Sequence, residues 1–173
     1  MTTETASFDL QTYLAARLNL AIYFFGYAIP FLVAQPQLLT GTIVNALLFV
    51  SSEKLGKKSL YPILILPSLG AISHGVLFGP RTFFLAYFLP FIWLGNYLQT
   101  SVFSLAGRWN YLARVLVSAS AKCLLLFAAA NIYYQARIVP QIFVTSMGAV
   151  QFITACLGGL LAYFILQSLK KYD

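Results

Sequence analysis

Charged residues are almost absent from this chain, and most of the basic ones lie in alternate gaps between long apolar runs. Only 9% of the residues are Asp, Glu, Lys or Arg, against 60% that are hydrophobic. A water-soluble fold needs enough polar side chains to cover its core, and this chain has too few. The pattern therefore predicts an all-α, polytopic membrane protein.

Six apolar stretches predict six transmembrane helices. A helix needs about 20 mostly apolar residues to cross a bilayer, and the breaks between the stretches contain proline, glycine or charged residues. Because the connections are short, we expect consecutive helices to be antiparallel neighbours in one integral-membrane domain, residues 1–173. A short polar segment, residues 1–10, precedes the first span. The predicted spans are residues 18–34, 38–51, 60–78, 82–105, 111–134 and 141–169.

The distribution of basic residues predicts the orientation. Eight of them lie on the N-terminal flank, in the second connection, in the fourth connection with its adjoining turn and at the C-terminus, whereas the other three connections hold only Arg81 and Arg137. Loops rich in Lys and Arg are retained in the cytoplasm. We therefore expect both termini to be cytoplasmic in a multi-pass protein of the plasma membrane. The lipid bilayer is the expected partner, and the scattered basic residues do not form the stripe that nucleic-acid binding requires.

Lys122 lies in the middle of the fifth predicted span, eleven residues from one end and twelve from the other. Its side chain is too deep to reach water easily, and a charge there costs at least about 2.5 kcal/mol unless it meets a polar partner or cavity. Ser118, Ala129 and Tyr133 share its face of the helix. We interpret Lys122 as a contact for an anionic or carbonyl-bearing small molecule in an outward-open pocket. Alternatively, it braces the bundle by donating hydrogen bonds to helix carbonyls.

Other polar residues are candidates for the same pocket. His74, the only histidine, lies in the outer half of the third span, where it either contacts the ligand or bonds a neighbouring helix. Arg81, at the outer mouth, either draws anions inward or anchors in the headgroups. Asn45 is expected to face the bundle interior, although interhelical amides also serve as structural contacts. The predicted ligand-binding residues are Lys122, His74, Asn45, Tyr133 and Arg81.

Small residues at helical spacing predict close packing, either within the bundle or against a partner protein. The third span carries a GxxxG pair, which lets two helix backbones approach each other. The sixth span carries a longer stripe on one face. The predicted packing residues are Gly75, Gly79, Gly148, Gln151, Ala155, Gly158 and Ala162.

Residues that catalysis and metal binding require are missing from the predicted spans. All four acidic residues are terminal or lie in a connection, so acid–base pairs and two-metal chemistry lack their parts. The two cysteines are far apart in sequence, without CxxC spacing. The chain also has no Walker motif. We therefore expect neither enzyme activity nor a metal nor a cofactor, and no energy source within the chain.

A compact chain with six spans, both ends inside and no energy source of its own resembles the S component of energy-coupling factor transporters, over nearly its whole length. In that family a vitamin or metal ion is held in an outward-facing pocket, and an ATPase pair with a transmembrane coupling subunit drives its release. The lysine of Ser120-Ala121-Lys122 looks like lysines that line the pocket in some members. The family's paired alanines in the first span are not repeated here, since Ala15 is followed four residues later by Asn19. The resemblance implies a substrate-binding subunit for uptake of a small molecule, with a coupling subunit and ATPases as partners.

Two other interpretations remain open. Residues 69–96 also resemble small uncharacterised membrane proteins that sometimes carry the label "iron hydrogenase", but two isolated cysteines cannot ligate an iron–sulfur cluster. A non-catalytic structural or assembly subunit of a membrane complex would explain the small-residue faces equally well. A polar cavity around Lys122 favours the binding subunit, whereas a solid core favours the structural one.

Overall fold

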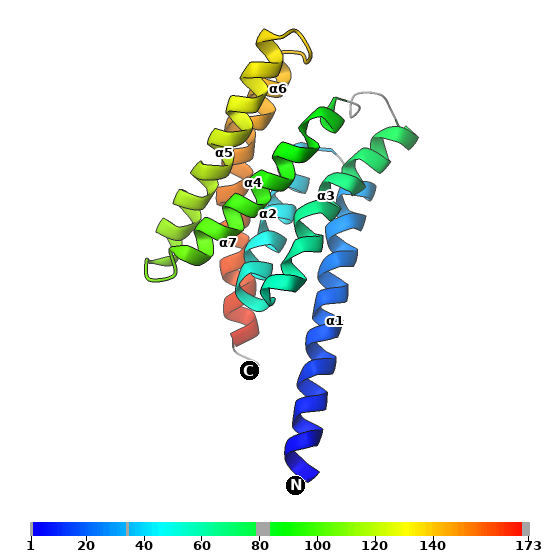
Figure 1. Ribbon diagram of the computed structural model, residues 1–173, viewed down its shortest axis with the longest axis vertical. Coiled ribbons are helices and arrows are strands. Elements are labelled where there is room, and N and C mark those ends of the chain that lie inside the picture. Colours follow the sequence, from blue (N-terminus) through cyan, green and yellow to red (C-terminus); the bar gives the residue numbers. More distant parts are fainter. Residues whose placement is uncertain (1, 34, 79–83, 171–173) are drawn as a thin grey trace.

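The computed structural model describes residues 2–33, 35–78 and 84–170, and every regular element in these ranges is an α-helix. Figure 1 shows the helices as one bundle, in which α1 begins and α7 ends at the same end. The helices are α1 (Thr2–Leu32), α2 (Gln37–Lys54), α3 (Lys57–Phe78), α4 (Leu85–Leu105), α5 (Tyr111–Gln135), α6 (Ile142–Met147) and α7 (Ala149–Lys170).

The helices follow the predicted stretches closely, with two differences. Helix α1 begins at Thr2 rather than near residue 18, so most of the polar segment 1–10 is helical. In Figure 1 this first part of α1 extends beyond the rest of the bundle. The sixth stretch is two helices rather than one, because the backbone of Gly148 (φ −97°, ψ −102°) leaves helical geometry between α6 and α7.

Within the described parts of the chain, three helical stretches are long and apolar enough to cross a membrane: Lys57–Val76, Tyr111–Gln135 and Ile142–Leu169. A shorter apolar stretch covers Ala16–Leu32. Helices α2 and α4 are not among them, although both were predicted as spans. These two helices carry several of the polar residues that the bundle buries, among them Asn45, Asn96 and Gln99, and such residues lower the hydropathy of a span.

The bundle buries polar side chains together with its apolar core, and it exposes large apolar side chains on the outside. Buried polar residues come from α2, α3, α4, α5 and α7, whereas large apolar residues on the outer helix faces are exposed, such as Leu20, Val76 and Leu124. An exposed apolar surface of this extent marks an interaction with a membrane or another protein.

The main helix pairings are α2 with α7, α1 with α3 and α4 with α5. In each pair a glycine allows the two helices to approach closely. A side chain at Gly158 in α7 would meet the backbone of α2, and one at Gly70 in α3 would collide with the carbonyl of Tyr27 in α1. Gly95 in α4 lies against the side chain of Lys122 in α5. Close approach at these positions brings the polar faces of α2, α4, α5 and α7 together in the centre.

Both ends of α5, the helix that carries Lys122, are fixed by local hydrogen bonds. At the N-terminus the side chain of Asn110 accepts a hydrogen bond from the Ala113 N–H at 2.8 Å, a typical helix cap. At the C-terminus the N–H groups of Arg137 and Ile138 reach back into the last turn, in the two-bond pattern of a Schellman motif. Arg137 there has a φ of 58°.

Candidate functional site

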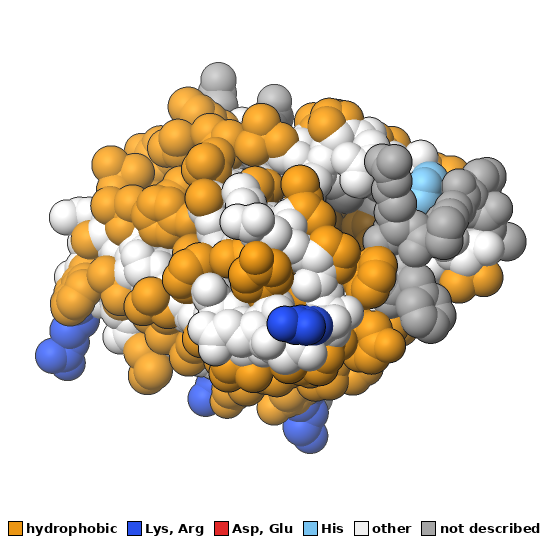
Figure 2. Space-filling model, turned by 90° about the horizontal axis from the view of Figure 1, so that it is seen from above, with side chains coloured by type: hydrophobic (Ala, Val, Ile, Leu, Met, Phe, Trp, Pro, Cys, Tyr) orange, Lys and Arg blue, Asp and Glu red, His pale blue; other side chains and the backbone are white. Residues whose placement is uncertain are grey.

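A cavity of about 660 Å³ lies in the half of the bundle opposite the α2–α3 connection. Its rim is formed at helix ends by residues such as Gln35, Phe84 and Pro140, and its floor includes Asn45 and Lys122 near the middle of α2 and α5. Figure 2 views the molecule from this end, where the surface is mainly hydrophobic or neutral and basic side chains are few. The volume is within the range of small-molecule sites.

Lys122 is held at the cavity floor by Asn45. Its Nζ donates a hydrogen bond to Asn45 Oδ1 at 2.8 Å, and its side chain is only 3% exposed. The hydrogen bonds of the amide nitrogen set the orientation of the Asn45 side chain. Its Nδ2 donates to the Gly41 carbonyl at 2.8 Å and to Thr154 Oγ1 at 3.3 Å. The amide oxygen therefore faces the lysine, and α2, α5 and α7 are joined at one point.

Lys122 lines the cavity, and neighbouring atoms restrict its aliphatic stem. A Cβ at Gly95 would lie 3.3 Å from Lys122 Cγ, so the absence of a side chain on Gly95 leaves room for the stem between α4 and α5. An ammonium has three N–H donors, and Asn45 accepts one of them. No acidic side chain lines the cavity in the described parts of the chain.

The cavity walls combine apolar surfaces with a few neutral polar groups. Such a surface suits a small molecule with an apolar body and one or two polar groups. The apolar walls include Pro30, Val44, Pro67, Ile92, Phe143 and Met147. The neutral polar lining includes Thr40, Ser68, Asn96 and Gln151.

Of the five predicted ligand contacts, the structure brings Lys122 and Asn45 together. His74 is not in the cavity lining; its Nδ1 donates to the carbonyl of Phe31 at 2.7 Å, joining α3 to α1. Tyr133 is not in the lining either. Its hydroxyl donates to the carbonyl of Tyr87 at 3.3 Å, and this hydrogen bond joins α5 to α4. Arg81 lies outside the described residues.

The predicted small-residue stripe of α7 faces the bundle interior. Gly158 contacts α2 closely, and Ala155 and Ala162 are fully buried. Gln151, predicted as a packing residue, lines the cavity instead. Gly148 ends α6, and a side chain there would meet the ring of Phe127 in α5. In the third span Gly75 is buried, and its partner Gly79 lies outside the described residues.

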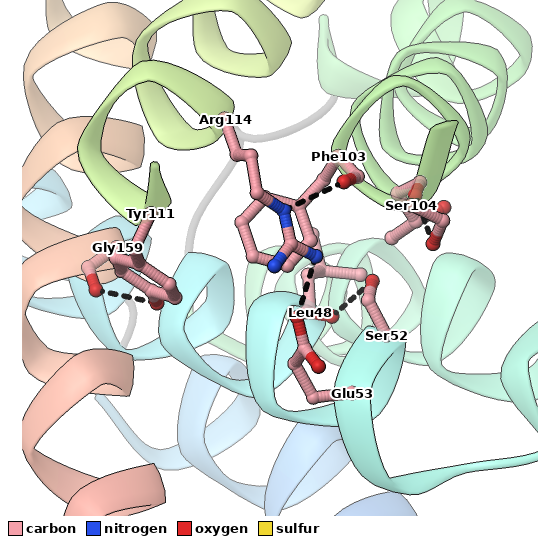
Figure 3. Close-up of polar contacts among 9 residues, drawn as sticks. Leu48, Ser52, Glu53, Phe103, Ser104, Tyr111, Arg114 and Gly159 are labelled. Atoms are coloured by element: carbon pink, nitrogen blue, oxygen red, sulfur yellow. Dashed lines mark hydrogen bonds and ion pairs between the residues drawn. The ribbon is translucent and has the colours of Figure 1, made fainter. Parts of the chain in front are cut away.

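A second polar cluster closes the bundle at the other end, below the cavity. Arg114 Nη2 forms an ion pair with Glu53 Oε1 at 2.5 Å, and its Nε donates to the carbonyl of Phe103 at 3.0 Å. The guanidinium also lies 3.9 Å from the centre of the Phe103 ring. Beside it, the hydroxyl of Tyr111 donates to the Gly159 carbonyl at 2.9 Å. Figure 3 shows how these contacts join α2, α4, α5 and α7.

Sequence reasoning missed this cluster, and it also missed three glycines at close helix contacts: Gly70, Gly95 and Gly26, where a Cβ would meet the side chain of Ile63. In the sequence Arg114 is one of the eight basic residues that indicate the orientation, and Glu53 is the acidic residue that lies in a connection. The available signal was that Glu53 is the one acid away from the chain ends. The three glycines occur singly and belong to no recognisable pattern.

Comparison of the chain with models of protein families, with curated proteins and with solved structures finds no match. Where side chains are described, no three His, Cys, Asp or Glu residues come together in a group that could hold a metal ion.

Proposed function

We propose that this chain is a membrane-embedded binding subunit for the uptake of a small anionic or carbonyl-bearing molecule. It spans the plasma membrane six times with both termini in the cytoplasm, and it holds its ligand in a cavity that is open to the outside. Like the S components that it resembles, it relies on a coupling subunit and ATPases for energy.

The observation that carries this proposal is an ammonium group at the floor of a cavity without an acidic partner. Lys122 is nearly fully buried, and its ammonium donates a hydrogen bond to the neutral amide of Asn45. Charged residues at membrane depth typically face a cavity and mark a substrate pathway. A ligand carboxylate or carbonyl would accept the remaining N–H donors and compensate the charge.

The distribution of charge supports the orientation. The cavity rim is formed by the connections that are poor in basic residues, whereas Lys54, Lys57, Lys58 and Arg108 lie at the opposite end of the bundle. If the basic end is cytoplasmic, the cavity opens to the outside. The exposed apolar helix faces then meet lipid, and the buried polar residues of α2 and α4 are shielded by their neighbours.

The alternative of a structural or assembly subunit has less support. The main support for a structural subunit was the small-residue stripe of α7, because such a stripe can pack against a partner protein. Ala155, Gly158 and Ala162 are instead covered by α2 and other parts of the same chain.

A thermal-shift experiment with the purified protein in detergent tests the proposal. The probes are small carboxylates with aromatic or aliphatic bodies, such as benzoate and hexanoate, each compared with the neutral alcohol of the same skeleton. We expect carboxylates that fit the cavity to raise the melting temperature of the wild type and not that of Lys122→Met, with little effect of the alcohols. Lys122→Met should remain folded because it removes a buried charge.

Lys57→Met is the matched control, since it removes an exposed lysine at the other end of the bundle. It should respond to the carboxylates as the wild type does. Equal shifts in the wild type and in Lys122→Met would contradict the proposed role of Lys122.

A further inference from the structure

Helix α5 carries a column of polar residues that continues from the cavity floor towards the inner end of the bundle. Lys122, Ser118 and Arg114 are spaced four residues apart, so they lie on one face of the helix. At a rise of about 1.5 Å per residue, each is about 6 Å from the next along the helix axis. Lys122 and Ser118 are buried. Arg114 forms the ion pair with Glu53 at the end of the bundle opposite the cavity, which is called the inner ion pair below.

The neighbouring helix α4 places Gln99 on the middle level of this column. Gly95 lies against Lys122, and the carbonyl of Phe103 accepts a hydrogen bond from Arg114. Helices α4 and α5 are antiparallel, and these two contacts fix their register. Gln99 is four residues from Gly95 and from Phe103, so the register places it opposite Ser118.

Helix α2 contacts α5 at the same two levels, those of Lys122 and Arg114. Asn45 accepts from Lys122, and eight residues later Glu53 forms the ion pair with Arg114. The cavity floor and the inner ion pair are therefore two levels of a single seam between α2, α4 and α5. Gln99 lies on the level between them.

The amide of Gln99 has unmet hydrogen-bonding capacity. The residue is fully buried, and neither its Oε1 nor its Nε2 has a hydrogen-bond partner among the described residues. Buried side-chain polar atoms are nearly always hydrogen-bonded to protein or water, and an unpaired amide in an apolar interior is strongly unfavourable. By contrast Asn45 and Asn96, the other buried amides of this region, are bonded to neighbouring helices.

We propose that Gln99 is an inner binding site for water and small polar or anionic solutes, reached through the α2–α4–α5 seam when the Glu53–Arg114 ion pair opens. The amide presents both a donor and an acceptor, which suits water or a carboxylate oxygen with its hydration shell. The ion pair and the Phe103 ring beside it form the next level of the seam beyond Gln99. This goes beyond the proposed function, which requires the outer cavity alone.

The test is the reaction of a single cysteine at position 99 with 2-sulfonatoethyl methanethiosulfonate, a small anionic reagent that does not cross membranes. The native Cys123 and Cys156 are replaced by alanine, Gln99→Cys is introduced, and labelling is followed in inside-out membrane vesicles. We expect slow labelling with the ion pair intact and at least a ten-fold higher rate when Glu53→Gln is added. The charge-exchanged pair Glu53→Arg with Arg114→Glu should restore the slow rate.

Ala162→Cys is the matched control, because it is equally buried in the inner half of the bundle but lies on α7. Its labelling rate should not change with Glu53→Gln. An equal increase at positions 99 and 162 would indicate general loosening and overturn the proposal. An unchanged rate at position 99 in both Glu53→Gln and Arg114→Gln would do the same. Because no ligand is needed, either result is independent of carboxylate binding in the outer cavity.

Discussion

Replacing Gly158 by alanine should destabilise the bundle through the α2–α7 contact. A Cβ at this position would lie 2.6 Å from Asn45 Cβ, 2.7 Å from the Thr42 carbonyl oxygen and 2.8 Å from the Ala46 nitrogen. Two of these atoms belong to the α2 backbone, so no side-chain rotation relieves the overlap. Restoring the closest contact to an ordinary 3.4 Å requires the two helices to separate by about 0.8 Å.

Such a displacement weakens the dispersion contacts along the interface. Inserting a methyl group into a tightly packed site typically costs about 1–3 kcal/mol, and we expect Gly158→Ala to lower the free energy of unfolding by this amount. Gly158→Leu should be worse and should prevent folding. The shift of α2 would also move Asn45 away from Lys122, so carboxylate binding should weaken in the same variant.

Equilibrium unfolding with sodium dodecyl sulfate, followed by circular dichroism, measures the effect. Gly56→Ala is the control, because the same substitution there meets nothing within 4 Å. It should be neutral or slightly stabilising, since alanine restricts the unfolded chain. Equal stability of Gly158→Ala and the wild type would refute the close α2–α7 contact.

Two further predictions concern the ends of α5. Arg137→Gly should stabilise the protein by about 0.5–1 kcal/mol, because the left-handed backbone at this position (φ 58°) is unfavourable for a residue with a Cβ. A loss of stability in the same unfolding assay would contradict this reasoning. Asn110→Ala should destabilise by about 1 kcal/mol through loss of the cap, and Asn110→Gly by much less. If Asn110→Ala leaves the free energy of unfolding unchanged, the side-chain cap contributes nothing.

The helices could be predicted from the sequence because apolar runs and polar breaks report directly on membrane-length segments. Hydropathy does not detect the part of a helix that continues through polar residues. The beginning of α1 was missed for this reason, since residues 2–17 include several polar and charged side chains. The break at Gly148 was missed because its neighbours are apolar, and a glycine within such a run gives no sign of whether it packs or ends a helix.

The candidate site was predicted in part. The energetic cost of a buried lysine identified Lys122, and a polar face identified Asn45 as a residue directed into the bundle. The positions of His74 and Tyr133 depend on how the helices cross, which helical periodicity in one chain does not determine. The α1–α3 contact takes His74 to the Phe31 carbonyl, and the α4–α5 contact takes Tyr133 to the Tyr87 carbonyl. Contacts between residues distant in sequence, such as Glu53 with Arg114, leave no local pattern.

An outward-open cavity with Lys122 at its floor is tested most directly by labelling a single cysteine at position 122. In the background without native cysteines, Lys122→Cys is exposed to 2-sulfonatoethyl methanethiosulfonate in intact cells and in inside-out vesicles, with Lys57→Cys as the reference for the cytoplasmic side. We predict that position 122 is modified in intact cells and position 57 only in inside-out vesicles. Modification of position 122 only in inside-out vesicles, or in neither preparation, would contradict a cavity that opens to the outside.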